Sequence, residues 1–167
     1  SQAILQIVFA HRGTDSIREA LEDIYMFLTA NVVQLKDADL FCNAAFNAIY
    51  QEYKGRNAQG NGWESLDDFT QRVSIIHTGH SLGGVLAQLT GLNTPVLSFE
   101  NPGTKEIIVK MINDNYPNQI ARNYLLDQIF NVFADHYYNI QAHVNWINTS
   151  MTQVGNVLRA DNLPYDY

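Results

Sequence analysis

Apolar residues along the chain follow two alternating patterns, short continuous runs and stripes with helical spacing. The runs predict buried strands at 3–10, 73–78 and 96–99. The stripes predict helices that begin near residue 16 and span 37–53, 82–89, 105–113 and 119–135. Gly91 is the predicted stop of the 82–89 helix, and Ile129 and Val132 are spaced for burial on the 119–135 helix. Alternating apolar and polar residues predict further strands at 138–146 and 154–160. Strands that alternate with helices indicate a single α/β domain, 1–167, with a mainly parallel sheet flanked by helices.

The helix that begins near residue 16 has a clear start signal. Ser16 and Glu19 have the spacing of a capping box, in which each side chain bonds a free backbone N–H of the first turn. The turn His11 to Thr14 joins the first strand to this helix. It lies at the carboxyl end of that strand. The N–H of Thr14 lies beside the exit of the 73–78 strand if the two strands are neighbours.

The strongest motif of the chain lies between a predicted strand and a predicted helix, where residues 79–83 read GHSLG and match G-x-S-x-G. A sharp strand-to-helix turn forces Ser81 into a strained backbone conformation and leaves no room for side chains at Gly79 and Gly83. Free N–H groups at the helix start, including that of Leu82, favour developing negative charge there. The motif predicts a nucleophile elbow; a glycine-serine turn without chemistry is the alternative.

Composition and charge narrow the classes of partner. The chain has 167 residues, of which 46% are hydrophobic, enough for one domain with a real core. Its 10 Lys and Arg residues stand against 17 Asp and Glu, which gives a net charge of −7. This balance argues against nucleic acid or an anionic membrane surface as a partner attracted by charge. Transient lipid contact through apolar residues remains open.

The single cysteine, Cys42, excludes a disulfide within the chain, and we do not expect a cysteine-based metal site. It lies in an apolar helical pattern, which favours a small buried core residue. These 167 residues contain neither a signal peptide nor an apolar run of membrane-spanning length, so the sequence indicates no compartment. It also indicates no oligomeric state.

Three stretches resemble the class 3 lipases, members of the α/β-hydrolase fold. Residues 78–92, TGHSLGGVLAQLTGL, are similar to the family's nucleophile elbow. Residues 7–14, IVFAHRGT, resemble the apolar strand that ends in the family's FRGT turn, and residues 96–103, VLSFENPG, resemble the strand that follows the elbow helix. The resemblance covers residues 4 to 110 well and the remainder weakly.

The resemblance implies cleavage of carboxylic esters through an acyl-enzyme on Ser81. It implies that the backbone N–H groups of Thr14 and Leu82 form the oxyanion hole. The substrate would be a lipid or another apolar ester. No metal and no organic cofactor is needed for this chemistry.

The other two members of a catalytic triad depart from the family pattern. The family places its acid just after the strand assigned here to 138–146, and the matching residue is Asn145. The family's base lies beyond the last strand, where this chain has no histidine. His143 is the preferred candidate for the base and His136 the next. The other three have simpler explanations: His80 is the variable residue of the elbow, His77 is packed or hydrogen-bonded within the elbow strand, and His11 precedes the oxyanion turn.

These departures leave three explanations. The chain is a fragment of a longer hydrolase trimmed at both ends, an inactive reduced relative, or a complete enzyme with a rearranged base. A non-catalytic hydrolase-like module used for binding or assembly is the alternative function. A dehydrogenase-like nucleotide fold is disfavoured because no G-x-G-x-x-G follows a strand.

Overall fold

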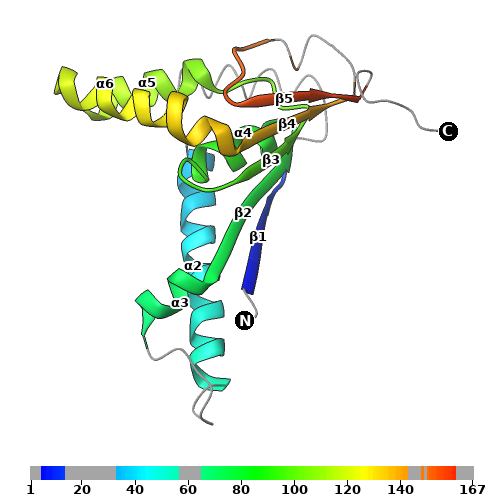
Figure 1. Ribbon diagram of the computed structural model, residues 1–167, viewed down its shortest axis with the longest axis vertical. Helices are drawn as coiled ribbons and strands as arrows, with labels where there is room; N and C mark the ends of the chain where they lie inside the picture. Colours follow the sequence, from blue (N-terminus) through cyan, green and yellow to red (C-terminus); the bar gives the residue numbers. More distant parts are fainter. Residues whose placement is uncertain (1–4, 14–32, 57–64, 143–147, 149, 161–167) are drawn as a thin grey trace.

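The computed structural model describes residues 5–13, 33–56, 65–142, 148 and 150–160 (Figure 1). Their strands form one five-stranded sheet in which every neighbouring pair is parallel. The strands follow one another across the sheet in chain order: β1 (Leu5–His11), β2 (Val73–His80), β3 (Val96–Phe99), β4 (Tyr137–Gln141) and β5 (Asn156–Arg159). The predicted parallel sheet is therefore confirmed, and β2 lies inside it.

The described helices occupy most of the predicted positions. They are α2 (Val33–Arg56), α3 (Leu66–Arg72), α4 (Leu82–Thr90), α5 (Lys105–Asn115) and α6 (Gln119–Asp127). A capping hydrogen bond from the N–H of Asp68 to the Ser65 hydroxyl starts α3. Helix α4 ends at Gly91, as its sequence predicts. The helix expected from residue 16 lies outside the described residues.

Three predicted elements have clearly different bounds. The helix expected over 37–53 is longer and spans Val33–Arg56. The helix expected over 119–135 is α-helical only to Asp127, then π-helical over Gln128–Val132 and 3₁₀-helical over Phe133–His136. The change of helix type alters which side chains face the core, so Ile129 is buried while Val132, also expected inside, is exposed.

The strand expected over 138–146 ends at Gln141 instead. There the N–H of Ala142 bonds the Glu100 carboxylate rather than a neighbouring strand. A side chain from another loop therefore ends the strand, which the local alternation of residues does not reveal.

The core lies on the face of the sheet where α2 and α4 pack (Figure 1). Every described residue of α4 from Leu82 to Leu89 is buried. Near the edge formed by β1, aromatic residues of α2 surround Phe69 of α3. On the opposite face, apolar strand residues are partly exposed: Val8, Leu97, Phe99, Tyr138 and Leu158. None of the helices in the described ranges is long and apolar enough to cross a membrane.

Phe69→Ala is expected to lower the free energy of unfolding by about 3–5 kcal/mol, because removing a fully buried ring leaves a cavity. Phe69 is 0% exposed, and its ring centroid lies 5.3 Å from that of Tyr50. Chemical denaturation followed by circular dichroism measures the loss. Leu66→Ala on the same helix, 44% exposed, is the control and should lose less than about 1 kcal/mol. Equal losses in the two variants would contradict this description of the core.

Candidate active site

Ser81 stands in the sharp turn between β2 and α4. Its backbone has φ 53° and ψ −123°, a conformation that residues with a side chain rarely adopt. Such a conformation costs on the order of 1–3 kcal/mol and persists only when its surroundings hold it. Here the Ser81 N–H donates to the Phe99 carbonyl at 2.9 Å, and the Ser81 carbonyl accepts from the Gly84 N–H at 2.9 Å. The strained strand-to-helix turn predicted from the sequence is present.

Three glycines allow the backbone to pack closely around this turn. A Cβ at Gly79 would lie 2.1 Å from the Gly83 carbonyl oxygen, and one at Gly83 would lie 2.3 Å from the carbonyl oxygen of His11. A Cβ at Gly13 would lie 2.3 Å from the His80 carbonyl oxygen. The turn that leaves β1 is therefore packed directly against the turn that holds Ser81, in agreement with the predicted proximity.

The start of α4 leaves hydrogen-bonding capacity beside Ser81. Leu82 is the first residue of α4, so its N–H has no partner within its own helix. The Ser81 side chain, 6% exposed, makes no capping hydrogen bond to that helix. Both the hydroxyl group and the N–H are therefore left for another partner, at a helix end whose dipole favours negative charge.

Of the remaining site residues predicted from the sequence, the structure describes only His136. Thr14, His143 and Asn145 lie outside the described residues, so their proximity to Ser81 stays a prediction. His136 is exposed and immediately precedes β4, whereas Ser81 follows β2. Because the strands are parallel, His136 lies at the amino ends of the strands and Ser81 at their carboxyl ends. This separation disfavours His136 as the base.

Sequence reasoning missed the role of Glu100, which directly follows β3. Like Ser81, Glu100 has a positive φ, 51°, and its N–H donates to the Ile140 carbonyl at 2.9 Å. One carboxylate oxygen accepts from the N–H of Ala142, and the other accepts from Asn148 Nδ2 at 2.7 Å. The signal available in the sequence was its position, an acidic residue at the carboxyl end of the strand next to β2. Glu100 joins the ends of β3 and β4 at the edge where Ser81 lies.

A network of buried amides fixes the segment after Glu100. Gln88 of α4 accepts hydrogen bonds from Asn101 Nδ2 at 3.2 Å and from the Thr104 hydroxyl at 2.7 Å. Its own amide donates to the Val154 carbonyl at 3.0 Å. Asn139 of β4 accepts from the Asn101 N–H at 3.1 Å. Because these groups are buried, their mutual hydrogen bonds specify a single arrangement of the elbow helix and the turn after β3.

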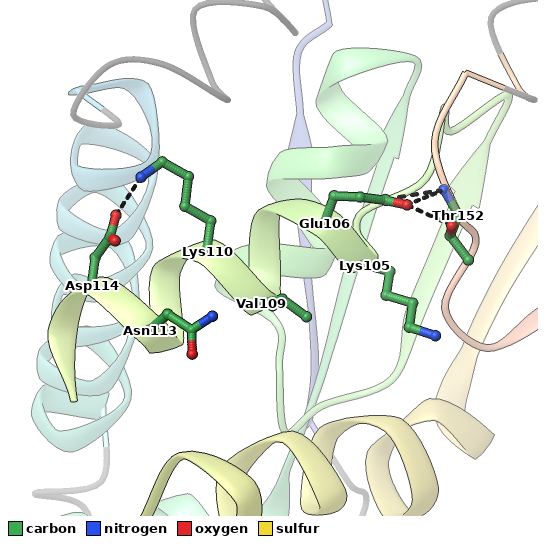
Figure 2. A pocket seen from close by; sticks show the side chains of 7 residues that line it. All are labelled: Lys105, Glu106, Val109, Lys110, Asn113, Asp114 and Thr152. Atoms are coloured by element: carbon green, nitrogen blue, oxygen red, sulfur yellow. Dashed lines mark hydrogen bonds and ion pairs between the residues drawn. The ribbon is translucent and has the colours of Figure 1, made fainter. Parts of the chain in front are cut away.

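A separate open hollow of about 600 Å³ runs along α5 (Figure 2). Three of its four charged side chains have partners on its own walls, and the fourth, Lys105, lies over the ring of Phe130. The Glu106 carboxylate accepts from the N–H and the hydroxyl of Thr152, and Lys110 pairs with Asp114 at 2.6 Å. Ser81 is not among the residues that line this hollow, so we do not treat it as the candidate active site.

A profile of the class 3 lipases matches residues 8–112, more than half of the chain. The chain belongs to the class 3 lipase family. The matched region contains β1, the Ser81 turn, α4 and β3, the elements whose geometry is described above. Membership supports a lipase-like hydrolase in general terms. Neither the curated proteins nor the solved structures give a match.

Gly83→Ala is expected to destabilise the fold more than Gly84→Ala, by a difference of at least about 2 kcal/mol. The added Cβ at Gly83 would meet backbone atoms of His11 and Gly13, which cannot move without separating the two turns. At Gly84 it would lie 3.1 Å from the Cβ of Ser98, 3.2 Å from the Cβ of Asn101 and 3.3 Å from the Gly79 carbonyl oxygen, contacts that are tight but not overlapping. Alanine also favours the helix by about 1 kcal/mol, which partly offsets those contacts. Urea denaturation compares the two variants, and equal stability would refute the close packing of the turns.

Proposed function

We propose that the chain is a serine hydrolase that cleaves carboxylic esters through an acyl-enzyme on Ser81. The observation that carries the proposal is the strained backbone at Ser81, at the start of a helix and against the turn that leaves β1. Strain of this kind is maintained at functional sites because it presents a side chain that a relaxed turn would not. Membership of the class 3 lipases supports the same reaction class.

In the proposed reaction, Ser81 Oγ attacks the ester carbonyl carbon while a base takes the hydroxyl proton. The carbonyl oxygen becomes an oxyanion, for which the N–H groups of Leu82 and Thr14 are the proposed donors. The intermediate collapses, and the alcohol leaves with the proton returned by the base. Water then attacks the acyl group on Ser81 by the same route, and the carboxylic acid is released.

The base and its orienting partner are the open part of this mechanism. His143 is the proposed base, and Asn145 is the residue at the family's acid position. Asparagine can orient an imidazole by a hydrogen bond, but it carries no charge to stabilise the imidazolium. We therefore expect the isolated chain to be a poor esterase, even with Ser81 well placed.

The proposed substrate is a lipid or another apolar ester. A net charge of −7 does not draw the chain to anionic membranes, so transient contact with a lipid surface would depend on apolar side chains. On α6, Ile120 and Tyr124 are 80% and 63% exposed and are suited to such contact. Nucleic acid is not a proposed partner.

The second candidate function is a non-catalytic module for binding or assembly. It is favoured by Asn145 at the family's acid position. The two functions differ in whether the Ser81 hydroxyl reacts. Labelling with a fluorophosphonate probe that depends on Ser81 supports the hydrolase, and no labelling supports the module.

Ser81→Ala is expected to abolish hydrolysis of a short-chain nitrophenyl ester, because no other group forms the acyl-enzyme. The rate of nitrophenol release measures the loss. Ser74→Ala, on the same strand but away from the turn, is the control and should keep the parent rate. Turnover that survives Ser81→Ala would disprove the proposed nucleophile.

His143→Ala separates the explanations for the missing triad residues. If His143 is the base, turnover should fall by at least about 100-fold, a typical contribution of general-base catalysis. Weak turnover that is unchanged by this substitution supports a fragment or an inactive relative. Brisk turnover that depends on Ser81 but not on His143 would assign the base to one of the other four histidines.

A further inference from the structure

A second cluster of reactive side chains lies among the elements that hold the Ser81 turn. His11 of β1, Cys42 of α2 and His77 of β2 each offer one ligand atom, and these three atoms all lie within 4.8 Å of one another. His11 Nε2 and His77 Nδ1 are 3.0 Å apart. The Thr90 hydroxyl of α4 lies 3.2 Å from the first and 3.1 Å from the second. The proposed ester hydrolysis uses none of these groups.

The cluster adjoins a cavity of about 320 Å³ between α2, α4 and the sheet. Cys42, His77, Thr90 and Asp39 are among the residues that line it. Asp39 and Cys42 are one helical turn apart on α2, so they lie on the same face of that helix. His77 is 4% exposed, and His11 and Cys42 are half-buried. Rigid elements on three sides therefore hold the ligand atoms together.

We propose that His11, Cys42 and His77 bind a zinc ion at a structural site that joins α2 to β1 and β2. Two imidazoles and one thiolate form a ligand set that zinc prefers. Tetrahedral zinc requires separations of about 3.3 Å between two nitrogens and about 3.6 Å between nitrogen and sulfur, from its usual bond lengths. The two facing nitrogens are 3.0 Å apart and no pair of ligand atoms in the cluster is more than 4.8 Å apart, so side-chain rotation would have to close about 1.2 Å at most. The exposed Asp39 lines the same cavity but lies outside this group of mutually close ligand atoms, so its carboxylate would have to turn toward the ion to become the fourth ligand.

The protonation states fit this chemistry. Burial lowers the pKa of His11, and burial together with the neighbouring His11 lowers the pKa of His77 to about 4. Both imidazoles are therefore neutral at neutral pH and have a lone pair to donate. In the hydrogen bond between them, one facing nitrogen carries the proton, so that ring must move its proton to its other nitrogen when zinc binds.

Cys42 supplies the proton that is released. Burial, and then the charge of Asp39, raises the pKa of its thiol, so without metal the sulfur is protonated. Zinc binding forms the Zn–S bond, breaks the S–H bond and passes that proton to water. No oxidant or reductant takes part. The ligand set is assembled only by the fold, which explains why a lone cysteine in the sequence gave no sign of a metal site.

The test uses the 167-residue chain without an affinity tag, treated with a chelator and then titrated with Zn²⁺ against a chromophoric competitor. We expect one zinc ion per chain and a rise in melting temperature on binding. Cys42→Ser should weaken zinc binding at least tenfold. His136→Gln, which removes an exposed histidine outside the cluster, is the matched control and should bind zinc like the parent chain.

Cobalt supplies a second readout. Co²⁺ bound by Cys42 should give a thiolate-to-metal absorption band that is absent in Cys42→Ser and present in His136→Gln. His11→Gln should weaken binding as well while keeping this band at saturating Co²⁺. Circular dichroism of each metal-free variant establishes that it is folded. Cys42 is half-buried whereas His77 is buried, so a substitution at Cys42 should disturb the fold less than one at His77.

Two results would overturn the proposal: no stoichiometric zinc binding by the parent chain, or equal affinity in the parent chain and folded Cys42→Ser. These measurements do not depend on ester turnover. A failure of the zinc site and a failure of the proposed hydrolase are therefore distinguishable.

Discussion

Close contact of backbone with backbone around Ser81 is the constraint on which the site depends. The parallel register that pairs His11 with Gly79 brings the end of β1 level with the end of β2. From there the two turns approach until a Cβ at Gly13, Gly79 or Gly83 would overlap main-chain atoms. Ser81 cannot relax from its positive φ without separating these turns. The packing of the sheet thus maintains the local strain.

At the carboxyl ends of β3 and β4, polar side chains hold the structure together instead of close backbone packing. Glu100 joins the ends of β3 and β4, and the Gln88 amide ties α4 to the segment that follows. Each of these groups is buried or half-buried and hydrogen-bonded. Loss of one partner leaves a buried polar group unsatisfied, which costs about 1–3 kcal/mol. This network makes the position of α4, and with it the position of Ser81, specific.

Strand β2 connects the two proposed sites. His77 lies on its buried face under α2 and α4, and Ser81 follows its carboxyl end. A metal ion bound at His11 and His77 would tie together the two strands whose ends form the Ser81 turn. The metal would stabilise the packing of α2 against β1 and β2. It would take no part in the proposed hydrolysis.

The sequence by itself determined the elements whose signal is local. The elbow glycines, the strand at 96–99 and the end of α4 at Gly91 agree with the structure because turn sterics and apolar runs depend on neighbouring residues. Thr14 and Asn145 remain predictions from family resemblance, and His143 remains a prediction made among this chain's own histidines. Only the tertiary structure decided that β4 ends at Gln141, because the carboxylate that captures the next N–H belongs to Glu100, far away in the chain. The same holds for the meeting of His11, Cys42 and His77, since parallel pairing and helix packing bring together residues whose order in the sequence carries no sign of their proximity.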